Sequence, residues 1–375
     1  MESDQTRQIP ATGRRLVSLD ALRGFDMFCI IGGMTVVRRI AKLIAGDARA
    51  GWYDVLEHQL HHVKWHGFVF YDLIFPLFVF VVGVAIPFSL CKRVERGEVT
   101  WQVYFKVFRR AVLLVLLGMI YQGLLEKGFS SDLRCTSVLG RIGVAYFFAA
   151  LITLNTTSFR ARGLWVAALL LGYWAAMTWI PVPGVGAGVL EPGKTLADYV
   201  DQQLLPGRLF KGNRDPEGLL STVPAVATCL LGVLAGAWLR RSQPNDYGKA
   251  AGLATAGAAC LAAGWLWSLT FPFNKNLWTS SFVLWAGGWS LLLLAAFYLI
   301  IDVWQWRKWS FFFVVIGMNA ITIYMARRFV DFSALGKLAF DRAPVPQEIL
   351  VPTAALTLEW LLLYVLWRSR IFLRL

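Results

Sequence analysis

The stretch that decides the fold is HQLHHVKWHGFVFYDLIFPLFVFVVG, residues 58–83. From Phe68 onward it is almost entirely apolar, with a single aspartate, Asp72. Such a run is typical of a transmembrane helix, because about 20 apolar residues cross the hydrocarbon core of a bilayer. The first part of the stretch holds all 4 histidines of the chain. The stretch therefore predicts a membrane-spanning helix that follows a histidine-rich segment at the membrane boundary.

The whole chain has the composition of a polytopic membrane protein. Of its 375 residues, 57% are hydrophobic and only 16% are charged, which is more apolar than a soluble domain. A hydropathy window of about 19 residues predicts an all-α bundle of about ten transmembrane helices that forms a single domain, residues 1–375. The expected spans are 20–37, 67–90, 111–126, 138–154, 163–180, 219–239, 249–271, 280–301, 310–326 and 349–367.

The connectors predict an orientation. An even number of spans puts both termini on one side, and the short connectors on that side are basic, as cytoplasmic loops are. The first fifteen residues are polar and basic, so we expect no cleaved signal peptide and an insertion signal in the first span. We expect both termini in the cytoplasm and an integral protein of a bacterial cytoplasmic (inner) membrane. The net charge of +14 is consistent with a membrane protein that contacts anionic lipid headgroups, and we expect no nucleic acid partner.

Two outer connectors, about 46–66 and 181–218, are longer than simple turns. In the second, apolar residues at helical spacing predict a short helix on the membrane surface. The first contains His58, His62 and His66, whose four-residue spacing predicts that they share one face of a helix leading into the second span.

The histidines have three readings. Two of them four residues apart could chelate a metal ion, but Asp54 and Glu57 do not complete a known ligand spacing, and we expect no metal. Hydrated histidines at the membrane interface are the plain alternative. The third reading gives one histidine work as a general base or nucleophile, because imidazole exchanges protons near neutral pH. The residues alone leave these readings open.

Charged and amide side chains lie within or beside several spans. Asp20, Arg23 and Asp26 fall in the first span, where charges are costly and usually face a partner or a watery cavity. An ion pair that only fixes the helices would explain them as well. Further polar residues at span boundaries are Asp72, Arg141, Asn274, Lys275, Asn276 and Asn319. Together they predict a polar cavity inside the bundle.

Six segments in order resemble the heparan-alpha-glucosaminide N-acetyltransferase family. They are RLVSLDALRGFDM (15–27), WHGFVFYDLIFPLFVFVVG (65–83), VLGRIGVAYF (138–147), DPEGLLSTVPAVATCLLGVLAG (215–236), FPFNKNLWTSSFVL (271–284) and GMNAITIYM (317–325). The resemblance implies a helical membrane bundle with acetyl-CoA as co-substrate. It implies transfer of the acetyl group from the cytoplasmic side to the amine of a glucosamine-type sugar or glycan on the outer side.

The resemblance also assigns residues. The family's catalytic histidine stands three residues before the tryptophan of an HxxWNG motif, and HHVKWHG puts His62 three residues before Trp65. His62 is therefore expected to act as general base or acetyl carrier, with Asp72 as a second catalytic residue. His66 replaces the family's asparagine, and Ala326 and Arg327 stand where the family often has a Gly-His pair. These differences do not affect the expected fold, but they leave the identity of the acceptor open.

The other expected site residues bind substrates. Those for the acceptor or the oxyanion are Asp26, Trp65, Arg141, Asn274, Asn276 and Asn319. For the phosphates of acetyl-CoA we expect Arg14, Arg15 and Arg23 at the cytoplasmic mouth, although arginines there could equally serve only to fix topology. An amino-sugar transporter and an O-acyltransferase of envelope glycans are the alternative functions. The expected partners are acetyl-CoA, the sugar acceptor and the lipid bilayer, and a homodimer is left open.

Overall fold

Long apolar helices dominate the described part of the chain. The structure is a computed structural model that describes residues 16–46, 51–340 and 347–373. Within these ranges, 6 helices are long and apolar enough to cross a membrane. They are α4 (Phe70–Ile86, continued by the π-helical turn η2, Pro87–Cys91), α8 (Val138–Asn155), α11 (Thr222–Leu239), α12 (Asp246–Ser268), α13 (Ser280–Phe297, continued by η3, Tyr298–Val303) and α17 (Gln347–Arg368). These helices fit the all-α membrane class that the sequence predicts.

Two of the expected spans are broken. The first is divided into α1 (Val17–Ile30) and α2 (Gly33–Ala45) at Gly32, whose φ of 107° is a left-handed conformation that glycine adopts readily. The expected span 310–326 is a pair of helices, α14 (Phe311–Met318) and α15 (Ala320–Phe329), bent by 69°. The prediction of continuous helices was wrong at these places. Among the described residues the number of candidate spans is at most 7, if the bent pair is one span, so ten remains a prediction.

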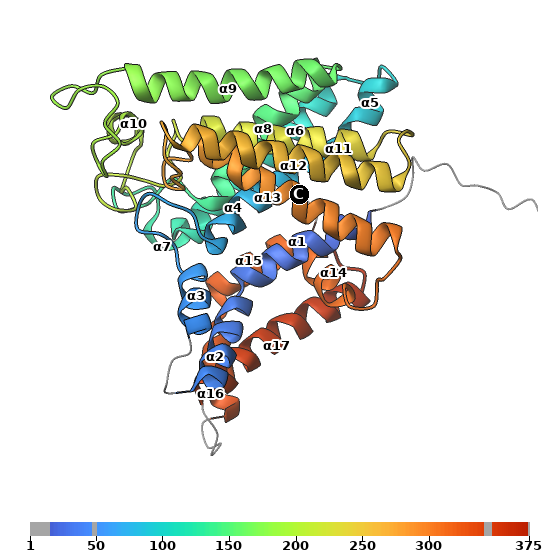
Figure 1. Cartoon of the computed structure of the whole chain (residues 1–375). Coiled ribbons are helices and arrows are strands. Elements are labelled where there is room, and N and C mark those ends of the chain that lie inside the picture. The colour runs from blue at the N-terminus through green and yellow to red at the C-terminus, as the bar shows by residue number, and fades with distance from the viewer. Residues whose placement is uncertain (1–15, 47–50, 341–346, 374–375) are drawn as a thin grey trace, which may run out of the picture.

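Two further helices overlap expected spans. The helix α9 (Phe159–Trp179) nearly coincides with 163–180, whereas α6 (Trp101–Tyr121) begins ten residues before the expected span 111–126 and ends five residues before its end. Each has 21 residues, or roughly 31 Å at 1.5 Å per residue. They are less apolar than the six spans: α6 carries Lys106, Arg109 and Arg110, and α9 begins with two arginines. In Figure 1, α9 lies along the upper edge of the bundle.

The centre of the bundle is the close contact between α4 and α11. A Cβ on Gly83 would lie 2.0 Å from the carbonyl oxygen of Cys229, and one on Gly232 would lie 2.1 Å from that of Phe80. Only glycine permits this approach of two backbones, which is a common way for helices to pack in membranes. The contact makes α4 a fixed element in the core, and α4 carries Asp72 in its first turn.

A second close contact joins α1 to α14. A Cβ on Gly24 would lie 1.7 Å from the carbonyl oxygen of Phe313, and one on Gly317 would lie 2.0 Å from that of Asp20. The polar first turns of α1 are thereby held against the bent helix pair.

Short helices and long loops gather at one end of the bundle, on the left in Figure 1. They include α3 (Gly51–Gln59), α7 (Leu124–Lys127) and α10 (Leu196–Leu204). The helix α10 confirms the short helix predicted in the connector 181–218. The remaining elements are α5 (Lys92–Glu95) and α16 (Phe332–Phe340).

The predicted histidine helix was wrong. The helix α3 ends at Gln59, and residues 62–69 are not helical, so His62 and His66 do not share a helical face with His58. Hydrogen bonds to other elements hold this segment instead. The backbone N–H of Gly67 donates to Phe273 O at 2.9 Å, and that of Phe70 donates to Gln59 Oε1 at 2.9 Å.

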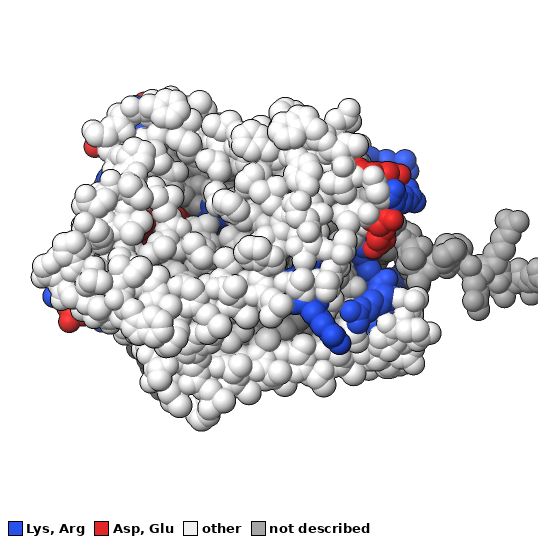
Figure 2. Space-filling model, turned by 90° about the horizontal axis from the view of Figure 1, so that it is seen from above, with Lys and Arg blue, Asp and Glu red and all other residues white. Residues whose placement is uncertain are grey.

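Charge is distributed unevenly over the surface. Seen from above, in Figure 2, the charged side chains lie mainly toward the two ends of the molecule, and uncharged side chains cover most of the area between. This pattern fits a protein whose middle faces lipid and whose ends face water.

Candidate functional site

His62 and Asp72 form a hydrogen-bonded pair at the start of α4. His62 Nδ1 lies 2.7 Å from Asp72 Oδ1, and the side chain of Asp72 is 1% exposed whereas that of His62 is 50% exposed. Asp72 Oδ2 accepts a hydrogen bond of 3.4 Å from the backbone N–H of Val69, and the helix N-terminus favours its negative charge. When Nδ1 donates to Asp72, Nε2 is the nitrogen of the neutral ring that can accept a proton.

Lys275 completes a three-residue cluster. Its Nζ lies 3.1 Å from His62 Nδ1, 3.3 Å from His62 Nε2 and 3.6 Å from Asp72 Oδ1. Because the distances to the two ring nitrogens are similar, the Lys275 amine lies beside the imidazole ring and not in line with one of its nitrogens. Burial lowers the pKa of Lys275, and the Asp72 carboxylate acts in the opposite direction. The cluster therefore combines a proton acceptor, an anion and a cation within 3.6 Å of one another.

The loop between α12 and α13 positions Lys275. Asn274 Oδ1 accepts a hydrogen bond from the backbone N–H of Leu277 at 3.0 Å, and the Asn274 N–H donates to Thr279 Oγ1 at 3.1 Å. An asparagine that bonds its own backbone in this way stabilises a turn. The turn holds Lys275 over His62, and the bond from Gly67 to Phe273 joins the same loop to the histidine segment.

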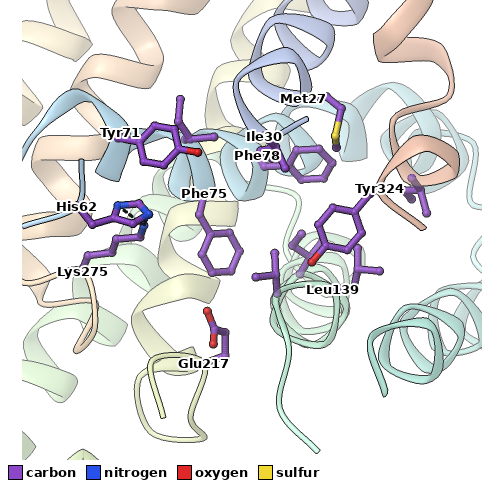
Figure 3. Close-up of a pocket in the computed structure, with 14 residues that line it drawn as sticks. Met27, Ile30, His62, Tyr71, Phe75, Phe78, Leu139, Glu217, Lys275 and Tyr324 are labelled. Atoms are coloured by element: carbon purple, nitrogen blue, oxygen red, sulfur yellow. Dashed lines mark hydrogen bonds between the residues drawn. The ribbon is translucent and has the colours of Figure 1, made fainter. Parts of the chain in front are cut away.

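The cluster faces a cavity of about 320 Å³. Its walls are mainly apolar, with α1, α4, α8 and α15 each contributing side chains. Figure 3 shows His62 and Lys275 side by side, with Tyr71 beside them and Glu217 reaching toward the same space from a separate loop. Tyr324 is a further polar group of the lining. A mostly apolar cavity with a few convergent polar groups is typical of a small-molecule site.

Glu217 belongs to an ion-pair network. Arg134 Nε and Nη2 donate to Asp215 Oδ2 and Oδ1 at 2.7 and 2.6 Å, and Arg134 also donates to Glu217 Oε2. Both acidic side chains are therefore fixed by one guanidinium group. The network holds the loop that carries Glu217 at the edge of the His62 cavity.

A second cavity, of about 420 Å³, lies on the other side of Phe78 and Ile321, which line both cavities. Its polar residues are Asp20, Arg23 and Arg110, and Arg23 Nη1 lies 3.4 Å from Asp20 Oδ1. Along α1, Asp20 and Arg23 line the second cavity, and Met27 and Ile30 line the first. The two cavities therefore lie one after the other along α1.

Comparisons with known proteins show what the chain is similar to. Residues 15–157 match the family model described as a domain of unknown function, DUF5009. The chain is 29% identical over 96% of its length to heparan-alpha-glucosaminide N-acetyltransferase of Mus musculus, and 28% identical over 97% of its length to that of Homo sapiens. The chain is a distant relative of these acetyltransferases. It spans 61% of the length of each.

Trp65, Asn274 and Asn276, three residues expected to bind the acceptor, lie near the cluster but do not line its cavity. Trp65 Nε1 donates to the carbonyl oxygen of Leu190 at 2.8 Å, which joins the histidine segment to the connector 181–218. Asn274 forms the turn described above. Asn276 is half-buried in the same turn. Their expected roles in binding remain predictions.

The other expected residues are dispersed. Asp26 is fully buried in α1, and neither carboxylate oxygen has a hydrogen-bond partner among the described residues. Asn319 lies at the bend between α14 and α15 and bonds Ile371 O at 3.1 Å, close to the second cavity. Arg141 lines a separate cavity. Arg23 lines the second cavity, whereas Arg14 and Arg15 lie outside the described residues.

Lys275, Glu217 and Arg110 are candidate functional residues that the sequence did not assign. Lys275 is one of the polar residues at span boundaries, and only the fold shows that it contacts His62. Glu217 lies in DPEG, the start of one of the six segments that resemble the family. The resemblance could have drawn attention to Glu217, but it does not show which residues Glu217 contacts. Arg110 lies in the polar half of α6, where a cation ordinarily indicates only a helix end at the membrane surface.

Asp201 on α10 predicts that the stability of the protein depends on pH. Burial raises its pKa to about 7, although its hydrogen bond from the backbone N–H of Leu219 acts against this. An unfolded aspartate titrates near about 4, so between these values the folded chain binds more protons and loses stability as pH rises, by up to about 1.4 kcal/mol per pH unit. We expect Asp201→Asn to flatten this dependence in thermal unfolding at several pH values. Asp132→Asn, in an exposed loop, is the control; an equal slope in all three proteins would contradict the prediction.

Proposed function

We propose that this protein transfers the acetyl group of acetyl-CoA to the amine of a glucosamine-type sugar, with His62 as general base or acetyl carrier. The proposal places both termini and the donor on the cytoplasmic side and the acceptor on the outer side of a bacterial inner membrane. The similarity to heparan-alpha-glucosaminide N-acetyltransferases supports the reaction class.

The observation that carries the proposal is the His62–Asp72 pair at a cavity edge, with a 2.7 Å bond that orients the imidazole. An amine attacks a thioester only after it has lost its proton, so the reaction needs a base beside the acceptor nitrogen. In the proposed reaction a C–N bond forms at the acetyl carbonyl and the C–S bond breaks. The proton from the amine goes to His62 Nε2 and the leaving thiolate ends as the thiol of CoA.

The alternative use of the same ring is as an acetyl carrier. Nε2 would then attack the thioester, hold the acetyl group and pass it to the amine. Lys275 suits either route, because its amine lies close enough to the ring to donate a hydrogen bond to the carbonyl oxygen as negative charge develops there. Steady-state kinetics with both substrates varied distinguishes the two routes, since a carrier gives parallel double-reciprocal plots.

The two cavities support a donor that approaches from the opposite side. Arg23 and Arg110 can bind phosphate oxygens of CoA in the second cavity, while the acetyl end points toward Phe78 and Ile321. Only this small group would need to pass that wall to meet His62. The acceptor would stay in the first cavity, which His62, Glu217 and Lys275 line.

The test is acetyl transfer by the purified full-length protein in detergent. Radiolabelled acetyl-CoA is incubated with glucosamine, and the product is separated and treated with hydroxylamine. We expect a labelled amide that survives this treatment. Loss of the label would indicate an ester and favour the O-acyltransferase. Absence of a labelled product, together with uptake of glucosamine into proteoliposomes, would favour the transporter.

The donor site makes a separate prediction. We expect Arg23→Gln to raise KM for acetyl-CoA by about tenfold or more, because a charge-assisted hydrogen bond contributes about 1.5–3 kcal/mol. KM and protein yield are measured together. Arg240→Gln is the matched control, since Arg240 pairs with Glu95 at 3.0 Å and lines a different cavity. A lower yield with an unchanged KM would instead mean that Arg23 only pairs with Asp20.

A further inference from the structure

A long apolar groove runs beside the His62 cavity. It consists of two cavities of about 350 and 480 Å³ that share Phe148, Val223 and Val226. One end lies at Arg141 and the other at Asn155, which are separated along α8 by roughly 20 Å at 1.5 Å per residue. That length suits an extended hydrocarbon chain, and it is more than half of the hydrocarbon core of a bilayer, which is about 30 Å thick.

The groove opens sideways onto the apolar surface of the bundle. Phe148 of α8 and Trp165 of α9 line it and are 49% and 46% exposed. A molecule dissolved in the membrane could therefore enter from the lipid without passing through water. A water-soluble ligand would gain little from walls of this kind.

The end of the groove at Arg141, its head, is polar, and part of the Arg141 guanidinium group has no hydrogen-bond partner among the described residues. Arg141 is 2% exposed and lines this end. Its Nη2 donates to Gly218 O and to Ser221 Oγ, but Nε and Nη1 have no hydrogen-bond partner among the described residues. Buried guanidinium N–H groups are costly to leave unpaired, and an oxyanion such as a phosphate satisfies them with strong hydrogen bonds.

Glu217 connects this head to the candidate site, because it lines both the groove and the His62 cavity. A ligand with its chain in the groove and its anion at Arg141 would therefore place the next group past Glu217 and toward His62. That group would lie where the proposed reaction needs the acceptor amine.

We propose that the acceptor is an amino sugar linked through phosphate to a membrane lipid. The lipid chain lies in the groove between α8, α9 and α11, the phosphate binds Arg141, and the sugar amine reaches His62. This inference rests on the proposed function and specifies its substrate class.

The experiment compares two acceptors with the purified full-length protein: glucosamine carrying a farnesyl phosphate and glucosamine carrying a methyl phosphate. We expect kcat/KM to be on the order of tenfold or more higher for the farnesyl compound, since burial of several CH₂ groups contributes at least this much. An octyl glucosaminide, which has a chain but no phosphate, tests the anion; it should be a poorer acceptor than the farnesyl compound by a similar factor.

Variants test whether a preference for the farnesyl compound comes from binding in the groove or only from its accumulation in detergent micelles. Val223 is partly exposed and lines both parts of the groove, so Val223→Phe should lower the farnesyl-to-methyl ratio of kcat/KM with little risk to folding. Leu234→Phe, at a partly exposed position on the same helix that does not line the groove, should leave the ratio unchanged. Arg141→Lys should reduce the preference for the phosphate compound over the octyl compound.

The outcomes separate the two proposals. Transfer to glucosamine with equal kcat/KM for the farnesyl and methyl compounds would overturn the lipid-linked acceptor and leave the proposed function intact. A preference for the farnesyl compound that Val223→Phe and Leu234→Phe leave equally unchanged would also overturn it, and would make the groove a site for structural lipid. Failure to acetylate any acceptor, including free glucosamine, would instead refute the proposed function.

Discussion

Replacement of His62 by alanine should lower acetyl transfer by about 10²- to 10⁴-fold, the usual contribution of a general base, while the protein reaches the membrane in normal amount. The ring is 50% exposed, so its removal leaves no large cavity, and Lys275 still lies 3.6 Å from the buried Asp72 carboxylate, so we expect the protein to remain folded. The measurement is kcat with labelled acetyl-CoA, normalised to folded protein by size-exclusion chromatography in detergent.

The other histidines provide matched controls. His58 is exposed on α3, and His61 bonds Arg38 and the carbonyl oxygen of Glu57 at 2.8 and 2.7 Å. We expect His58→Ala, His61→Ala and His66→Ala to retain most of the activity, and chelators to affect none of the proteins. Full activity of His62→Ala would refute its assignment. A chelator-sensitive loss shared by the His58 and His62 variants would indicate a metal site.

Asp72→Asn should be the second most damaging change, with a loss of about 10²- to 10⁴-fold in kcat. An asparagine can present its amide N–H to His62 Nδ1, which would leave the proton on the wrong ring nitrogen. It also removes the carboxylate 3.6 Å from Lys275, whose pKa burial already lowers. KM for acetyl-CoA should change little, because Arg23 and Arg110, which are proposed to bind the donor, line the other cavity.

The control for charge is Asp54→Asn, an exposed aspartate on α3, which we expect to be neutral. A large rise in the acetyl-CoA KM of Asp72→Asn with an unchanged kcat would show that Asp72 acts on donor binding. Equal activity of Asp72→Asn and the unmodified protein would exclude a role for Asp72 in orienting His62.

The candidate site was predictable only where one short segment contains it. His62 and Asp72 lie ten residues apart and were both expected at the site, and the structure places them 2.7 Å apart. Lys275 comes from a loop more than two hundred residues away in sequence, and Glu217 from another. Hydropathy and motif spacing describe single segments, so they cannot show which distant polar residues meet at one end of a bundle.

The fold, like the site, could be predicted from the sequence only in part. Each expected span overlaps a helix of the structure, because apolar composition is a strong local signal, but ten membrane crossings remain a prediction. The breaks at Gly32 and Asn319 were not predicted, since a window of this length averages over a single residue. The non-helical backbone before α4 depends on the bond between Gly67 and Phe273, a tertiary contact that the four-residue spacing of the histidines does not contain.

The wall formed by Phe78 and Ile321 has a further consequence for a cell that carries this protein. Two cavities that joined into one open passage would let protons and ions cross and would discharge the membrane potential. In the proposed orientation, with the cavities open to opposite sides of the membrane, the apolar side chains between them form a permeability barrier, because an ion that enters apolar surroundings loses its hydration. Substitution of Phe78 by a small residue would therefore be expected to slow growth through ion leakage, whatever its effect on acetyl transfer.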